Sequence, residues 1–407
     1  MTEIAIASAT IVILILGLTL LLLLARGRLM PQGSLQVLVN DLKDLPANRG
    51  DSLLEVLHRN NVLIPAACGG SGTCGLCRVV VTGSGAGEPQ ATERGILSPK
   101  ERREHVRLAC QTKLRGNCSA KVPPDFLDSA GGFACRVVST RMLAPLIKEI
   151  VLEIPPDQPW SFRAGAFLQL SARPYSLEFS GLDLPEPFRD VWRKSGWSEL
   201  RVISEETVTR AYSIASRPED MGKAVFNIRL AVPPPGRERD VPPGIVSSWL
   251  FSREMGDMVD VSGPFGDFFV QPTNREMVFV GGGVGMAPLR AMIHEQLQLK
   301  SDRPMRYFYG ARSAADLFYL DEFAALSNEH ERFSWTPVLS DPAPGDNWFG
   351  ETGFVHEVLA KALSRHPAPE DCEYYLCGPP VMISAVRATL KRLGVESSSI
   401  FFDDFGV

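Results

Sequence analysis

Three cysteines stand close together in the stretch CGGSGTCGLC, which runs from Cys68 to Cys77. Their spacing is C-x5-C-x2-C, and four glycines lie among them. Thiolates in such short patterns bind zinc, bind iron–sulfur clusters or form redox-active disulfides. A zinc ribbon would supply a second close C-x2-C pair, which the sequence lacks, and a redox dithiol would leave Cys68 unexplained. The pattern therefore favours a metal centre completed by a fourth thiolate from elsewhere in the chain.

Two later cysteines are candidates for that fourth ligand, Cys110 in the segment RLACQ and Cys118. Three close cysteines and one distant one resemble the [2Fe–2S] plan of plant-type ferredoxins, although the first gap there is one residue shorter. RLACQ is similar to the segment around the last ligand of those ferredoxins, whereas Cys118 opens a predicted strand. Zinc and structural thiols stay open as alternatives. The resemblance implies that the cluster ligands are Cys68, Cys74, Cys77 and Cys110.

A small α+β domain of the β-grasp ferredoxin type, residues 33–130, is expected to position these cysteines. The segment DSLLEVLHRNN predicts a short helix, because Ser52 can cap it with Glu55 three residues later. A second capped helix is expected from Ser98. The predicted strands are Ser34–Val39, Arg78–Gly83 and Cys118–Pro123.

The N-terminus carries an uncharged apolar run from Ile4 to Ala25. A helix of this length would rise about 33 Å, enough to cross the hydrocarbon core of a bilayer. The alternatives are a signal peptide or a buried core helix, but a basic leader and a small-residue cleavage site are both missing. We expect residues 1–28 to be a retained single-pass anchor. Arg26 and Arg28 at its end place the rest of the chain on the cytoplasmic side.

The second half carries the segment RAYSIAS, from Arg210 to Ser216. With PPGIVSSWL (Pro242–Leu250), it resembles the ferredoxin–NADP reductase superfamily, whose first subdomain is an antiparallel β-barrel that holds FAD. The resemblance implies that Arg210 pairs with the flavin pyrophosphate, that Tyr212 packs on the flavin ring and that Ser213 bonds near its reactive edge. Further FAD-binding residues implied by it are Gly244, Val246, Ser247 and Ser248. Before this motif we expect a strand from Phe162 to Ser171, followed by about thirty residues without a clear period that contain Trp192 and Trp197.

A glycine-rich turn follows in EMVFVGGGVGMAPLRAMI, which begins at Glu276. An apolar strand, a glycine turn and a helix that starts near Ala287 form a phosphate-binding arrangement. The turn is not G-x-G-x-x-G, so a dehydrogenase of the usual Rossmann type is not expected. It resembles the nucleotide turn of ferredoxin reductases, and NADH is favoured over NADPH because acidic residues surround the single cation Arg312. The resemblance implies nucleotide contacts from Gly282, Gly283, Gly285, Gly310, Arg312, Cys377, Gly378 and Pro379.

The order of the parts, together with EDCEYYLCGPP and the tail FFDDFGV, resembles the F subunits of Na+-translocating NADH:quinone oxidoreductases. In that family Phe405 of the tail lies against the flavin. The resemblance therefore implies that the residues at the reacting rings are Tyr212, Ser213, Cys377 and Phe405.

This family resemblance implies a multidomain chain with an anchor (1–28), a ferredoxin-like domain (33–130), an FAD-binding barrel (131–272) and an α/β Rossmann-like NADH domain (273–407). NADH would reduce FAD by hydride transfer, and single electrons would pass through the cluster to other membrane subunits of a bacterial inner-membrane complex, which reduce quinone and pump Na+. The alternatives are the reductase of a multicomponent oxygenase and a cofactor-binding scaffold without turnover. The net charge of −5 and the absence of a basic run give no reason to expect nucleic acid as a partner.

Overall fold

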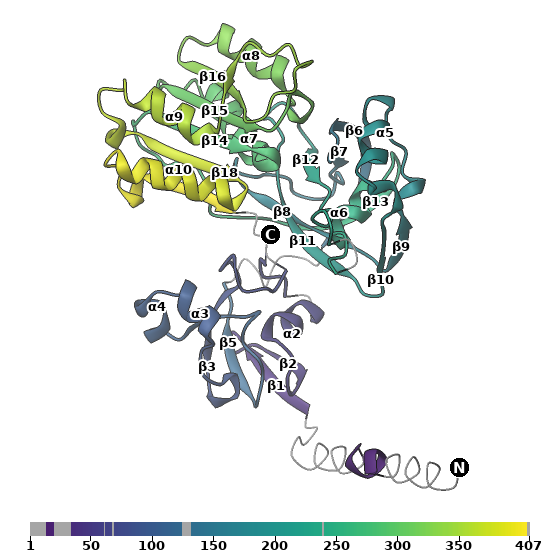
Figure 1. Cartoon of the computed structure of the whole chain (residues 1–407). Coiled ribbons are helices and arrows are strands. Elements are labelled where there is room, and N and C mark those ends of the chain that lie inside the picture. Colours follow the sequence, from purple (N-terminus) through teal and green to yellow (C-terminus); the bar gives the residue numbers. More distant parts are fainter. Residues whose placement is uncertain are drawn as a thin grey trace. The chain divides into compact units, whose positions relative to one another are not determined.

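Two compact units divide the chain in the computed structural model, which describes residues 14–19, 34–60, 62–66, 69–123, 132–237 and 240–404 (Figure 1). The first unit is Met1–Ile64 with Cys77–Asp128, and the second is Pro65–Leu76 with Ser129–Val407. Cys68 and Phe405 lie outside the described residues.

The first unit contains a mixed five-stranded sheet in the order β2-β1-β5-β3-β4. The predicted helix is confirmed as α2: the Ser52 side chain accepts from the Glu55 amide, and the Glu55 carboxylate accepts from the Ser52 amide. Leu53, Val56 and Leu57 of this helix are fully buried, which fixes it against the sheet. The elements are β1 (Ser34–Val39), β2 (Lys43–Asn48), α2 (Leu53–Arg59), β3 (Arg78–Thr82), η1 (Ser84–Ala86), α3 (Ala91–Ile96), α4 (Pro99–Arg103), β4 (Val106–Leu108) and β5 (Cys118–Lys121).

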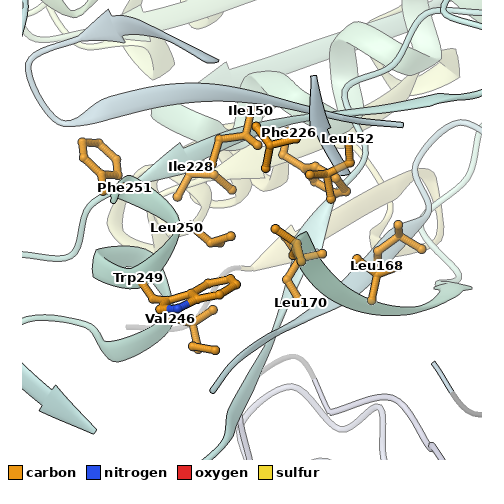
Figure 2. Close-up of a cluster of buried hydrophobic side chains, with 14 of the residues drawn as sticks. Ile150, Leu152, Leu168, Leu170, Phe226, Ile228, Val246, Trp249, Leu250 and Phe251 are labelled. Atoms are coloured by element: carbon orange, nitrogen blue, oxygen red, sulfur yellow. The ribbon is translucent and has the colours of Figure 1, made fainter. Parts of the chain in front are cut away.

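The second unit begins with an antiparallel six-stranded sheet in the order β11-β8-β13-β6-β7-β12. A hydrogen bond from Ala215 N to Val225 O (2.8 Å) brings the residues after β11 against β12, so the sheet curls into a barrel. Alternate side chains of β7, β8 and β12 point inward, and helix α6 covers them with Val246, Trp249 and Leu250 (Figure 2). The elements are β6 (Phe133–Ala144), β7 (Ile147–Glu153), β8 (Phe167–Ala172), β11 (Val208–Ser213), β12 (Lys223–Arg229), α6 (Ile245–Phe251) and β13 (Met258–Phe265).

The structure corrects one sequence expectation in the barrel and gives elements to a stretch for which none was predicted. Strand β8 starts at Phe167 rather than Phe162, because Gly165 makes a turn with φ +102° in which an added Cβ would overlap the Phe268 carbonyl oxygen. The stretch without a clear period is ordered as well. It folds around fully buried Trp192, whose Nε1 donates to Pro145 O (2.6 Å). Its elements are β9 (Tyr175–Glu178), η3 (Phe179–Gly181), α5 (Glu186–Lys194), η4 (Trp197–Glu199) and β10 (Arg201–Ser204).

A parallel six-stranded sheet completes the second unit, in the order β17-β16-β15-β14-β18-β19. Successive side chains of its strands point to opposite faces of the sheet. Phe279 and Tyr375 pack in one core with α7 and α8, while Val280 and Leu376 pack in the other core with α9 and α10. Helices on both faces bury the central strands β14 and β18 completely, as is usual in parallel sheets. The elements are β14 (Met277–Gly282), η5 (Gly283–Gly285), α7 (Met286–Gln298), β15 (Met305–Ala311), η6 (Ala314–Asp316), α8 (Leu320–Glu329), β16 (Phe333–Leu339), β17 (Glu351–Thr352), α9 (Val355–Leu363), η7 (Pro369–Asp371), β18 (Glu373–Gly378), α10 (Pro380–Arg392), η8 (Ser397–Ser399) and β19 (Ile400–Asp404).

Most of the predicted membrane anchor falls outside the described residues. Residues 14–19 are helical, and their leucine and isoleucine side chains are exposed. Within the described ranges, no helix is both long enough and apolar enough to span a bilayer.

Candidate functional site

The register of β3 separates the two candidates for the fourth cysteine ligand. Cys77 immediately precedes β3, and its carbonyl oxygen accepts from Ala109 N (2.8 Å), so Cys110 emerges beside it. The Cys77 and Cys110 sulfur atoms are 3.2 Å apart. Cys118 lies at the other end of β3, where its Cα would be 3.4 Å from a Cβ added to Gly83. Six residues of strand separate the two ends by about 20 Å, so Cys118 cannot share a cluster with Cys77.

A buried ion pair fixes the segment that carries Cys110. Glu93 is fully buried, and its carboxylate accepts from Arg107 Nε (2.8 Å), from Arg107 Nη2 (2.9 Å) and from Leu108 N (3.1 Å). Burial opposes the charge of Glu93, but these hydrogen bonds outweigh it and lower the pKa of the carboxyl. Burial also raises the pKa of the Cys118 thiol. Cys118 is therefore a neutral core thiol.

Two glycines of the cysteine loop take a left-handed backbone conformation. Gly70 and Gly72 take positive φ angles of 96° and 82°, which other residues rarely adopt. Cys74 in this loop is half-buried. Within the first unit, the close pair of Cys77 and Cys110 fits thiolate ligation of a cluster.

Strand β11 carries three of the predicted flavin residues. Arg210 and Tyr212 are two residues apart and therefore lie on the same side of the strand. Ser213 lies on the other side, where it is buried. All three are held by antiparallel pairing with β8 in the register Arg210↔Leu170 to Ser213↔Phe167. Tyr212 packs against the barrel core, and burial raises the pKa of its phenol, so the hydroxyl stays protonated. The strand therefore presents a guanidinium and an uncharged aromatic ring on the same side.

The start of helix α6 supplies the other predicted flavin residues. Gly244 is the N-cap, and an added Cβ there would lie 2.8 Å from the Ala231 Cβ. Ser247 Oγ bonds to Gly244 O (3.1 Å) and accepts from Ala231 N (3.2 Å). Ser248 Oγ is buried and has no hydrogen-bond partner among the described residues. An orphaned hydroxyl is costly unless a ligand satisfies it, so the residues present fit the pyrophosphate of FAD.

The predicted nucleotide residues meet where β14 and β18 end. The chain adds β15, β16 and β17 on one side of β14, and β18 and β19 on the other side, so the order of strands reverses between β14 and β18. Parallel α/β sheets bind ligands at such switch points. A Cβ on Gly285 would overlap the Cys377 carbonyl oxygen, and one on Gly378 would lie 2.9 Å from Gly282 O. Cys377 itself is fully buried. The structure therefore brings the glycines, Cys377 and Pro379, the N-cap of α10, to one edge of the sheet.

Arg312 and Gly310 lie at the same edge, at the end of β15. The Arg312 Nη2 is 3.2 Å from Asp341 Oδ2, and Asp341 follows the adjacent strand β16. Both side chains are largely exposed. An acidic partner makes this rim unfavourable for the 2′-phosphate that distinguishes NADPH from NADH.

A separate cluster at the opposite edge has the residue types of a metal site. His366 Nε2 is 3.1 Å from Glu276 Oε2 and 3.9 Å from the Cys372 sulfur. The His366 Nδ1 accepts from Ala368 N (3.2 Å), so Nε2 carries the ring proton and donates to Glu276. Burial raises the pKa of the Cys372 thiol to about 11. In this structure the three side chains form a hydrogen-bond network at the edge of the sheet away from the predicted nucleotide residues.

One flavin-side residue gave no signal in the sequence. Tyr175 of β9 donates from its hydroxyl to Ile245 O (2.5 Å) in the first turn of α6. It lies in the stretch without a period, where only tertiary packing orders the chain, and its role in bracing α6 could not be predicted.

Three family models match the chain in sequence order. Residues 39–115 match the 2Fe-2S iron-sulfur cluster binding domain. Residues 198–270 match the oxidoreductase FAD-binding domain, and residues 279–388 match the oxidoreductase NAD-binding domain. The chain thus carries an iron–sulfur, an FAD and an NAD module.

Full-length relatives share this order. The F subunit of the Na(+)-translocating NADH-quinone reductase of Serratia proteamaculans is 45% identical over 386 residues, which cover 94% of each chain. The same subunit of Neisseria meningitidis is 44% identical over 385 residues and also covers 94% of each chain. Such identity across almost the whole of both proteins includes all three modules.

Solved structures show the same fold. The cytochrome P450 reductase GcoB of Amycolatopsis superposes with a TM-score of 0.59 at 27% identity, covering 91% of this chain and 98% of that one. The ferredoxin reductase of carbazole 1,9a-dioxygenase superposes with a TM-score of 0.58 at 24% identity, covering 92% and 99%. The second likeness shows the fold alone.

Proposed function

This chain belongs to the family formed by the F subunits of Na(+)-translocating NADH-quinone reductases, and we propose that it is the subunit through which electrons from NADH enter that complex. The observation that carries the proposal is the order of the iron–sulfur, FAD and NAD modules on a chain that matches its relatives over 94% of their length. When bound, FAD accepts a hydride from NADH and the [2Fe–2S] cluster passes single electrons onward.

The residues of this chain bind and orient these groups. Cys68, Cys74, Cys77 and Cys110 are the proposed cluster ligands. Arg210, Tyr212 and Ser213, together with the start of α6, hold FAD, and Phe405 of the tail lies against it. The glycine edge of the parallel sheet holds NADH and keeps side chains away from the dinucleotide. No side chain has to donate or accept a proton, because the role of the protein is to stack the two rings.

We also propose a membrane location and membrane partners for the chain. Residues 1–28 anchor it in the bacterial inner membrane, and residues 33–130, 131–272 and 273–407 are three cytoplasmic domains. Exposed apolar side chains along the helical residues 14–19 support the anchor. The electron acceptors are other membrane subunits of the complex, which reduce ubiquinone and translocate Na+.

The full chain, purified in detergent with FAD and iron, tests this function. NADH should bleach the flavin absorption, produce the EPR signal of a reduced [2Fe–2S] cluster and sustain ferricyanide reduction. Flavin-replete protein that NADH does not reduce would overturn the proposal. An oxygenase-reductase role is less supported, since the P450 reductase shares only 27% of its residues with this chain. Turnover after addition of the membrane subunits of the complex would separate the two.

A further inference from the structure

Arg290 connects helix α7, which follows the glycine turn, to the end of strand β11, which carries the predicted flavin residues. It lies one turn into α7, whose first residue follows the glycine turn. Its Nη1 donates to Ala215 O (2.7 Å), two residues beyond Ser213 at the end of β11. The side chain is 4% exposed. A single buried guanidinium thus joins the element that carries the glycine turn to the element that carries the flavin motif.

Glu322 of α8 holds this guanidinium in place. Its two carboxylate oxygens accept from Arg290 Nε (2.6 Å) and Nη2 (2.8 Å), and His294 Nε2 lies 2.8 Å from Oε1. Paired bonds of this type fix the plane of a guanidinium. The orientation of Arg290 toward Ala215 is therefore set by α8.

Tyr319 makes the second connection between the sheet and the barrel. Its ring lies under Arg290, with the guanidinium carbon 4.4 Å from the ring centroid. Its hydroxyl donates to Glu149 of β7 and accepts from Asn227 Nδ2 of β12 (2.8 Å). Arg141 of β6 in turn binds Glu149 through Nε (2.7 Å). Strands β7 and β12 thus bind the Tyr319 hydroxyl directly, and β6 binds it through Glu149.

The backbone of Tyr319 is strained. Its φ is +58°, in the left-handed region that a bulky aromatic residue seldom occupies. Such conformations persist only where the surroundings determine them, and they concentrate at functional sites. The ring position under Arg290 is therefore maintained at the expense of local stability.

We propose that Arg290 and Tyr319 are positioning residues for hydride transfer, which hold the nucleotide module against the barrel at the ring separation that the reaction needs. This inference rests on the proposed function. Hydride transfer depends steeply on distance, and a misplacement of about 1 Å can cost about a hundredfold in rate. Neither side chain touches the reacting atoms; both act through Ala215, Glu149 and Asn227.

Two variants test the proposal in the full chain loaded with FAD. Arg290→Lys keeps the charge but cannot make three directed bonds at once, and Tyr319→Phe keeps the ring but loses both barrel bonds. Arg303→Lys is the matched control. Arg303 is also buried, bonds to Glu373 (2.6 Å) and to the carbonyl oxygen of Gln271 (3.0 Å), but lies at the opposite edge of the sheet.

Both test variants should retain FAD and be reduced normally by dithionite. At saturating NADH their flavin reduction should be at least about tenfold slower than that of Arg303→Lys, with a larger isotope effect from NADH deuterated at C4. Without NADH, amide hydrogen exchange should rise around Ala215 and in α8 in these two variants only. Rates within twofold of the Arg303→Lys protein, or loss of FAD, would overturn the positioning role. Wild-type protein that NADH fails to reduce would instead count against the proposed function.

Discussion

Cys77 and Cys118 lie at opposite ends of β3, while Cys110 lies against Cys77 with its sulfur 3.2 Å away. The order of these cysteines along the chain does not reveal this separation. Strand β5 runs antiparallel to β3 and starts at Cys118, beside the end of β3 that is far from Cys77. The arrangement leads directly to a test of the proposed cluster ligands.

Replacing Cys110 with alanine should abolish the visible absorption and EPR signal of the [2Fe–2S] cluster, because a four-thiolate site loses a ligand. The FAD absorption should be unchanged, since Cys110 belongs to the first unit and the proposed flavin residues belong to the second. Cys118→Ala is the control and should keep the cluster, at a modest cost in stability for a buried thiol. A Cys110→Ala protein with an intact cluster would exclude Cys110 as the fourth ligand.

The pair formed by Arg312 and Asp341 predicts the choice of nucleotide. Wild-type protein should use NADH in preference to NADPH. Asp341→Ser should raise kcat/KM for NADPH by up to about tenfold, because it releases Arg312 for a 2′-phosphate.

Steady-state kinetics with both nucleotides measures that change. Asp302→Ser provides the control: Asp302 pairs with Arg332 at 3.3 Å before the same two strands, at the edge away from the nucleotide. An equal gain of NADPH use in the control would show that net charge, and not the Arg312 pair, sets the preference.

Gly285 should tolerate no side chain. An alanine Cβ would overlap the Cys377 carbonyl oxygen, and relieving that overlap should cost about 1–3 kcal/mol of stability or more. Gly285→Ala should therefore lower the thermal midpoint and raise KM for NADH, while the cluster spectrum persists. Gly345→Ala has open space around the added Cβ and should behave as wild type. Equal midpoints for the two variants would contradict the close approach of η5 to β18.

Glu322 should make the second unit sensitive to acid. Burial opposes its ionisation, but hydrogen bonds from His294 and Arg290 and the charge of Arg290 lower its pKa from 4.5 to about 2. Arg217 and Tyr319 also lie within electrostatic reach of this network. A carboxyl with a depressed pKa stabilises the fold above its unfolded pKa and loses that contribution as pH falls toward the folded value.

Wild-type protein should accordingly lose up to about 3 kcal/mol between about pH 5 and pH 2 through this group. Glu322→Gln should be less stable at pH 7, and its deficit should shrink as the pH falls. Urea unfolding at pH 7, 5 and 3.5 measures this, with Glu329→Gln on the exposed side of the same helix as control. A pH-independent deficit would mean that packing, rather than charge, dominates at this position.

Local signals in the sequence were sufficient wherever a short segment decides its own structure. The Ser52 and Glu55 capping box and the strand into the glycine turn are both confirmed. The stretch around Trp192 was not predictable, because its order comes from one indole bond to Pro145 and from burial against the barrel. Arg290 and Tyr319 also gave no signal, since their partners come from three distant segments.

The glycine edge of the parallel sheet has a consequence for how this protein can change. Gly282, Gly285 and Gly378 form its floor: Gly285 lies against the main chain of Cys377, and Gly378 lies against the main chain of Gly282 and the side chain of Met382. Mutation can alter little there without breaking the sheet, whereas Arg312 and Asp341 on the exposed rim are free to vary. A change of nucleotide preference in this protein is therefore to be sought in the rim charges, with the glycine floor left as it is.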